Sequence, residues 1–96
     1  MRISFKRSGG FAGLTLAADL DTASLPLNEA HKVQRMVEEA GFFDLPASIP
    51  APAQGADAFQ YVVTVEDEGK RHTVRTNDLT VPDALWPLLE YLTKTA

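Results

Sequence analysis

The sequence predicts an α+β fold, in which two helices lie on one face of a four-stranded antiparallel sheet in the chain order ββαββα. Two pairs of segments alternate apolar and polar residues with a period of two, which is typical of strands covered on one face. Each pair is followed by a stretch with apolar residues at helical spacing. The 96 residues, 45% of them hydrophobic, suit a single domain over residues 1–96.

The first strand pair flanks a glycine-rich segment. Ile3 and Phe5 are apolar at alternate positions before this segment, and the stretch from Leu14 to Leu20 alternates in the same way after it. This pattern predicts two antiparallel strands joined by the glycine-rich loop.

The first helix is predicted to end near residue 40. Pro26 suits its first turn, with either Ser24 or Asn28 as the capping residue. Gly41 fits the left-handed position that follows many helices. Prolines at 46, 50 and 52 then predict a surface loop over residues 47–56. The apolar face of this helix comprises Ala30, Val33, Met36, Val37 and Ala40.

The positions of two arginines predict the length of the second hairpin loop. A three-residue loop at 67–69 would place Arg71 and Arg75 on the same face as Val63. A loop with an even number of residues instead places Val63 beside Val74 and turns both arginines toward water. Since burial of unpaired cations is costly, we predict the even loop.

The second helix is predicted after Thr80-Val81-Pro82-Asp83, which resembles a capping box. Pro87 cannot donate a backbone hydrogen bond, so a kink or a restart is expected at residues 86–87. Its apolar face comprises Leu85, Leu88, Leu89 and Leu92. With both helices on one face, the opposite face of the sheet carries the cations Arg2, Lys6, Arg71 and Arg75.

Composition excludes several classes of function. The net charge of −4 argues against nucleic-acid binding, and the absence of cysteine excludes disulfides and thiolate zinc sites. No run approaches the roughly 20 apolar residues of a membrane span, and the N-terminus does not resemble a signal peptide. His31 and His72 lack a spaced partner for metal binding or acid–base catalysis. We therefore expect a cytoplasmic, monomeric protein without catalytic residues, metal or cofactor.

The glycine-rich segment Gly9-Gly10-Phe11-Ala12-Gly13-Leu14 is the strongest candidate for a functional loop. A hairpin tip faces water and usually carries Asn, Asp or Ser, whereas this one carries a bulky ring. Two interpretations stay open: Phe11 folds back onto the core, or it is held outward to contact a partner.

Several pieces of the sequence together resemble the emfourin family. They are Arg-Ser-Gly-Gly-Phe-Ala-Gly-Leu at 7–14, Ala-Gly-Phe-Phe-Asp-Leu-Pro at 40–46, Asp-Ala-Phe-Gln-Tyr at 57–61 and Arg-His-Thr-Val at 71–74. Members of this family are small protein inhibitors of thermolysin-like (M4) zinc metalloproteases, found in bacteria beside protealysin-type enzymes. The resemblance extends over nearly the whole chain.

The resemblance implies a non-catalytic inhibitor that reversibly occludes the protease cleft with one or two loops. Thermolysin-like enzymes favour bulky apolar side chains just after the scissile bond, so Phe11 or Leu14 would fill that pocket. A second contact would come from residues 76–80 or from the proline-rich segment 45–56. The predicted protease-binding residues are Gly9, Gly10, Phe11, Ala12, Gly13, Leu14, Asn77 and Asp78.

Two other classes of function remain as alternatives. The first is a non-catalytic interaction or adaptor domain that binds an acidic partner through the cationic sheet face. The second is a small enzyme or ligand-binding protein, which would need a deep pocket with convergent polar groups.

Overall fold

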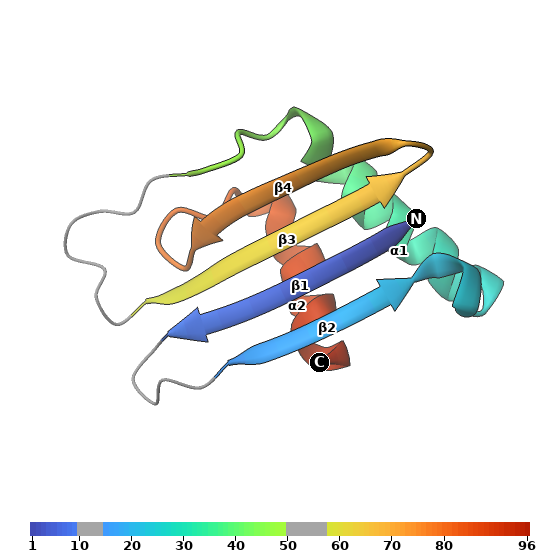
Figure 1. Ribbon diagram of the computed structural model, residues 1–96, viewed down its shortest axis with the longest axis horizontal. Helices are drawn as coiled ribbons and strands as arrows, with labels where there is room; N and C mark the ends of the chain where they lie inside the picture. Colours follow the sequence, from blue (N-terminus) through green and yellow to red (C-terminus); the bar gives the residue numbers. More distant parts are fainter. Residues whose placement is uncertain (10–14, 50–57) are drawn as a thin grey trace.

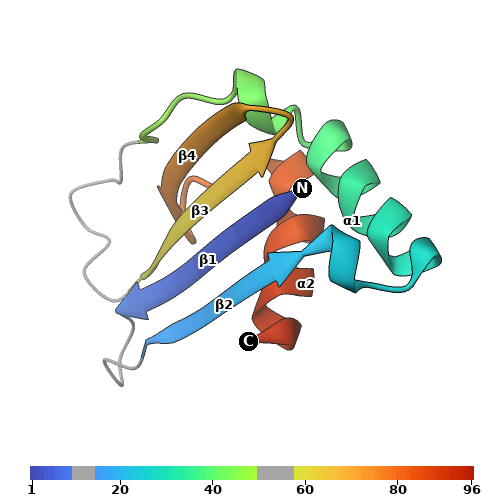
Figure 2. The same ribbon diagram turned by 45° about the vertical axis from the view of Figure 1, so that its right-hand side comes forward.

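The computed structural model describes residues 1–9, 15–49 and 58–96, and it shows the predicted antiparallel sheet (Figure 1). The strands lie in the spatial order β2-β1-β3-β4, with β1 (Arg2–Gly9), β2 (Leu16–Asp21), β3 (Phe59–Asp67) and β4 (Lys70–Asn77). Two helices, α1 (Leu27–Glu39) and α2 (Trp86–Thr95), lie on the same side of the sheet (Figures 1 and 2). The predicted α+β class and the ββαββα order are confirmed.

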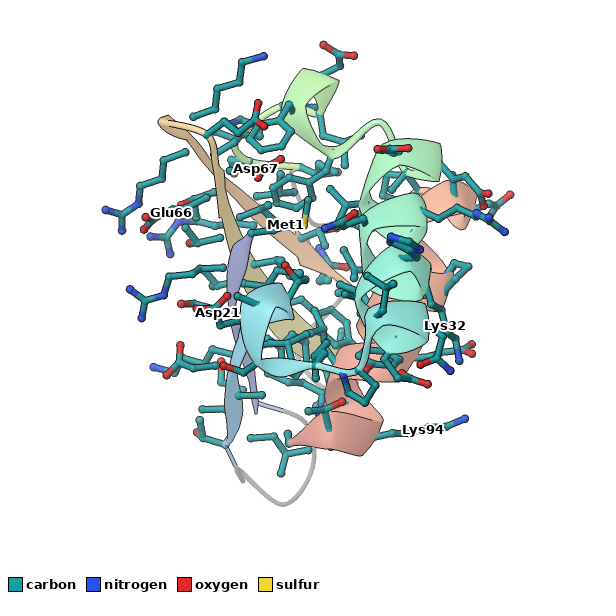
Figure 3. The ribbon with its side chains drawn as sticks, turned by 90° about the vertical axis from the view of Figure 1, so that its right-hand side faces the viewer. Met1, Asp21, Lys32, Glu66, Asp67 and Lys94 are labelled. Atoms are coloured by element: carbon teal, nitrogen blue, oxygen red, sulfur yellow. The ribbon has the colours of Figure 1, made fainter. Side chains whose placement is uncertain are left out.

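The core lies between the sheet and the two helices. Alternate residues of the strands point into it, and no described helix or strand covers the opposite face of the sheet, which we call the uncovered face, as the edge-on view in Figure 3 shows. Leu85, Leu88, Leu89 and Leu92, the predicted apolar face of the C-terminal segment, are all buried. The largest fully buried side chains from the other elements are Ile3, Val33, Phe42, Val63, Val65, Val74 and Asn77.

The second hairpin has the predicted even loop. Val63 pairs with Val74, and Asp67 pairs with Lys70, which leaves the two-residue turn Glu68-Gly69. Both turn residues have positive φ, 50° and 81°, as a type I′ turn requires. This register places Arg71 and Arg75 on the uncovered face, where both side chains are exposed.

The helix ends correct two predictions about capping. Pro26 itself is the N-cap residue of α1, and neither Ser24 nor Asn28 caps the helix, because no side chain makes a capping hydrogen bond there. The capping box predicted at residues 80–83 is also wrong. The chain instead forms a 3-10 turn at Asp83–Leu85 and restarts as α2, with Pro87 in its first turn. The predicted restart and the left-handed Gly41 are confirmed.

Part of the predicted loop after α1 is ordered against the sheet. Residues 42–44 form a 3-10 turn, and the chain then runs beside the outer edge of β4. The Ile49 N–H donates to the Arg75 carbonyl, and the Arg75 N–H donates to the Ala47 carbonyl, both at 2.9 Å. The predicted surface loop over residues 47–56 is therefore confirmed for residues 47–49, which belong to no helix or strand and in addition cover a sheet edge, and residues 50–56 lie outside the described residues.

The glycine-rich segment is described only at its ends. Gly9 is the last residue of β1, and β2 begins at Leu16. Phe11 and Leu14 lie outside the described residues, and so does the choice between an inward and an outward Phe11. In the described ranges, no helix is long and apolar enough to cross a membrane.

The β3–β4 turn yields a stability prediction. Glu68 adopts φ 50°, which is unfavourable for most residues but tolerated by asparagine, the preferred first residue of a type I′ turn. We expect Glu68→Asn to raise the free energy of unfolding by about 0.5 to 1 kcal/mol in urea titrations. Glu68→Gln removes the same charge without easing the backbone, so it should give no comparable gain. If both variants raise the free energy of unfolding equally, removal of the negative charge and not the backbone conformation is the cause.

Candidate functional site

Four strand ends meet at one end of the sheet, which we call the loop end. Here β1 ends at Gly9, β2 begins at Leu16, β3 begins at Phe59, and β4 ends at Asn77 (left side of Figure 1). Antiparallel pairing imposes this arrangement, because strands joined by short connections start and finish at the same sheet end. The chain thus enters and leaves residues 10–14 at the same end of the sheet as the turn that follows β4, with β3 between β1 and β4.

Asp78 fastens this turn to the first residues of β3. Its Oδ2 accepts a hydrogen bond from the Phe59 N–H at 3.0 Å, and its Oδ1 accepts one from the Tyr61 hydroxyl at 2.6 Å. In return, the Asp78 N–H donates to the Phe59 carbonyl at 3.2 Å. Three hydrogen bonds therefore hold a surface turn against a central strand.

Burial and the contact with Asp78 together raise the pKa of the Tyr61 hydroxyl. Only 5% of the residue is exposed, and burial followed by the hydrogen bond and charge of Asp78 raises the pKa of Tyr61 to about 12. The nearby Arg7 guanidinium acts in the opposite direction and lowers this pKa by a smaller amount. The phenol is consequently neutral, and it is a donor to Asp78 throughout the physiological pH range.

Arg7 is a cation on the helix-covered face of the sheet. It pairs with Tyr61 across β1 and β3, and its guanidinium carbon lies 4.2 Å from the centre of the Phe59 ring. Its Nε is buried and has no hydrogen-bond partner among the described residues. The Trp86 ring packs edge-on against Tyr61, with 6.2 Å between ring centres, and closes the cluster from α2.

The sequence analysis did not single out this cluster. A signal was present, because Arg7 continues the inward alternation of Ile3 and Phe5 and therefore had to find partners beneath the sheet. Those partners, Phe59 and Tyr61, lie more than 50 positions further along the chain, and only the β1–β3 pairing brings them to Arg7.

Gly9 has a backbone that few other residues would adopt. Its φ is +86°, and a Cβ atom at this position would lie 3.3 Å from the Ala58 carbonyl oxygen, just before β3. Glycine therefore allows the entry into the glycine-rich segment to pass close to the start of β3. Of the predicted segment 9–14, Gly9 is the part that the structure describes.

The turn after β4 exposes a leucine. Asn77 is only 1% exposed, and its Oδ1 accepts a hydrogen bond from the Leu79 N–H at 2.9 Å. The Thr80 N–H donates to the Asn77 carbonyl at 3.1 Å, which tightens the turn further. Leu79 itself is 58% exposed. The predicted contact residues Asn77 and Asp78 thus use their side chains within the fold, and the structure adds Leu79 as the apolar group of this turn.

The described residues offer little for catalysis. Within residues 1–9, 15–49 and 58–96, no group of three His, Cys, Asp or Glu side chains could hold a metal ion. His31 is exposed on α1, and the His72 Nε2–H donates to the Leu45 carbonyl at 2.7 Å.

The uncovered face of the sheet carries its charges unevenly. At the end away from the loop end, Arg2 lies between Asp21 and Glu66 in the pairing register, and Arg71 lies 3.6 Å from Glu66. Glu66 projects from this face in Figure 3. The predicted cationic face is thus locally neutralised at this end, and its excess positive charge lies closer to the loop end.

Because the Tyr61 hydroxyl is buried and hydrogen-bonded to Asp78, the free energy of unfolding should fall at alkaline pH. The pKa of Tyr61 is about 12 in the folded protein and near 10 in the unfolded chain. The neutral Tyr61 hydroxyl therefore makes its full contribution to the free energy of unfolding below pH 10. This contribution, about 1 to 3 kcal/mol, should disappear as the pH rises to about 12. Urea unfolding of wild type and Tyr61→Phe should therefore give a stability difference that shrinks between pH 10 and 12. A difference that stays constant over this range would contradict the shifted pKa.

Comparison with known proteins places the whole arrangement in one family. The family model for Emfourin matches residues 5–93, a range that includes the loop end, all of β2, β3, β4 and α1, and most of β1 and α2. No curated protein and no solved structure matches the chain. On the strength of that match over nearly its entire length, the chain belongs to the emfourin family.

Proposed function

We propose that this protein inhibits thermolysin-like (M4) zinc metalloproteases by reversibly occluding their active-site cleft with its loop end. Membership of the emfourin family supports an inhibitor of metalloproteases. The observation that carries the loop-end mechanism is the triple attachment of the 78–80 turn to β3 through Asp78.

An inhibitor of this kind requires a rigid support more than it requires chemistry of its own. Binding is weakened when loops must be ordered on association, so loops that are fixed beforehand bind more tightly. Here Asp78 fixes the turn, Arg7 and Phe59 pack together at the base of the loop end, and Trp86 braces Tyr61 from α2. Sites held on strands in this way are positioned more accurately than sites on free loops.

The contact with the protease would be mainly apolar. In the proposed complex, Phe11 or Leu14 enters the pocket that accepts bulky apolar side chains, and the flanking glycines keep Cβ atoms away from the cleft walls. Leu79 provides a second apolar contact from the neighbouring turn. Asn77 and Asp78 act indirectly in this proposal, because their side chains hold the backbone on either side of Leu79 in place.

Phe11→Ala tests the first contact. Truncation of a buried interface anchor commonly costs about 2 to 4 kcal/mol, so we expect the inhibition constant to rise roughly 30-fold to 1000-fold. The measurement is the inhibition of a thermolysin-like protease acting on a fluorogenic peptide, with urea unfolding as a check on the fold. Unchanged inhibition by a folded Phe11→Ala would dismiss Phe11 as the anchor, and a loss in Leu14→Ala would assign that role to Leu14.

Leu79→Ala tests the second contact, with Leu27→Ala as a matched control. Both leucines are exposed, 58% and 73% respectively, but Leu27 begins α1 at the opposite end of the sheet. We expect Leu79→Ala to weaken inhibition by about 5-fold to 30-fold and Leu27→Ala to leave it unchanged. Equal effects of the two substitutions would mean that the turn after β4 does not contact the protease.

A further inference from the structure

A shallow trough crosses the uncovered face of the sheet near the loop end. It has a volume of about 470 Å³ and lies over β1, β3 and β4, beside the segment 47–49 that borders the sheet. Val62 lies at the middle of its floor, and Ile49 lines it from the bordering segment. Side chains that line it with polar groups are Lys6, Ser8, Ser48, Gln60 and Arg75.

Two cations flank the floor of this trough. Lys6 and Arg75 lie in one row across the sheet, with Val62 between them. In the parts of the chain that the structure describes, neither has a carboxylate within ion-pair distance, whereas Arg71 on the same face pairs with Glu66. Both side chains are exposed, so the row carries two available positive charges on a protein with a net charge of −4.

The distance between Lys6 and Arg75 indicates which kind of ligand the trough would bind. Lys6 and Arg75 are two strands apart, which corresponds to about 10 Å between their backbones. Alternate residues of an extended peptide are about 7 Å apart, a shorter spacing that the long, flexible side chains of lysine, arginine and glutamate can bridge. The half-buried Val62 and Ile49 offer apolar contact to the aliphatic parts of such a peptide. A nucleic acid fits less well, because the acidic protein as a whole repels a continuous phosphate backbone.

We propose that this trough binds an acidic, extended segment of a partner protein, with carboxylates paired to Lys6 and Arg75. The trough adjoins the loop end, because Asn77 also lines it, but Lys6 and Arg75 take no part in the proposed protease inhibition, so the two proposals can fail independently. Ser8, Ser48 and Gln60 supply hydrogen-bond donors and acceptors to the peptide between the two charges. Binding of this kind is expected to weaken with salt, because its charges are exposed to solvent.

The test uses a fluorescently labelled octapeptide in which glutamate alternates with serine, with anisotropy as the readout. The double variant Lys6→Gln with Arg75→Gln should bind it about 5-fold to 30-fold more weakly than wild type, and raising the salt from 50 to 300 mM should weaken wild-type binding. The matched control is Lys70→Gln with Arg71→Gln, which removes the same charge from the other end of β4 and should cost less than 3-fold.

Several outcomes would overturn the proposal. Equal losses in the two double variants would indicate attraction to overall charge and no specific trough. Equal binding of a peptide with glutamine in place of glutamate, or no saturable binding by wild type, would exclude recognition of carboxylates. A loss of peptide binding in Leu79→Ala would place the peptide at the loop end. Unchanged binding in Leu79→Ala, together with a selective loss in the Lys6 and Arg75 variant, supports the trough.

Discussion

The carboxylate of Asp78 is the contact on which the loop end depends. It joins the turn after β4 to the first residues of β3, with one oxygen on a backbone N–H and the other on the Tyr61 hydroxyl. A carboxylate that accepts two hydrogen bonds in a partly buried position is costly to remove, because both donors would be left unpaired. The geometry of the turn that exposes Leu79 is therefore coupled to the packing of Tyr61 beneath the sheet.

The packing beneath the sheet extends this coupling to β1 and α2. Arg7 stacks on Phe59 and approaches Tyr61, and Trp86 packs edge-on against the Tyr61 ring. The Arg7 guanidinium would be unfavourable beneath the sheet without the face of the Phe59 ring and the Tyr61 hydroxyl beside it. The same cluster thus braces the residues that precede the glycine-rich segment and those that follow residues 50–57. The proposed inhibition requires such a rigid support for the loops.

The two faces of the sheet differ in burial and in charge. The covered face, with the helices packed on it, supplies stability and holds the loop end in place. The uncovered face has its charges paired at one end and two free cations, Lys6 and Arg75, in the described part of the other end. In the two proposals, the side chains that would contact a partner, Leu79 on the loop end and Lys6 and Arg75 on the uncovered face, are exposed and lie outside the core.

The sequence by itself determined the elements, the sheet face that is covered and the register of the second hairpin. These follow from local periodicity and from the cost of burying Arg71 and Arg75, which need no knowledge of distant contacts. Only the tertiary structure decided the roles of Arg7 and Asp78, the cover over the β4 edge and the exposure of Leu79. Each of these rests on contacts between residues far apart in the sequence, such as Tyr61 with Asp78 and Ala47 with Arg75, which become neighbours only when the strands pair. The helix caps were mispredicted for a different, local reason, since Pro26 and the 3-10 turn at Asp83–Leu85 stand where the local patterns favoured capping side chains.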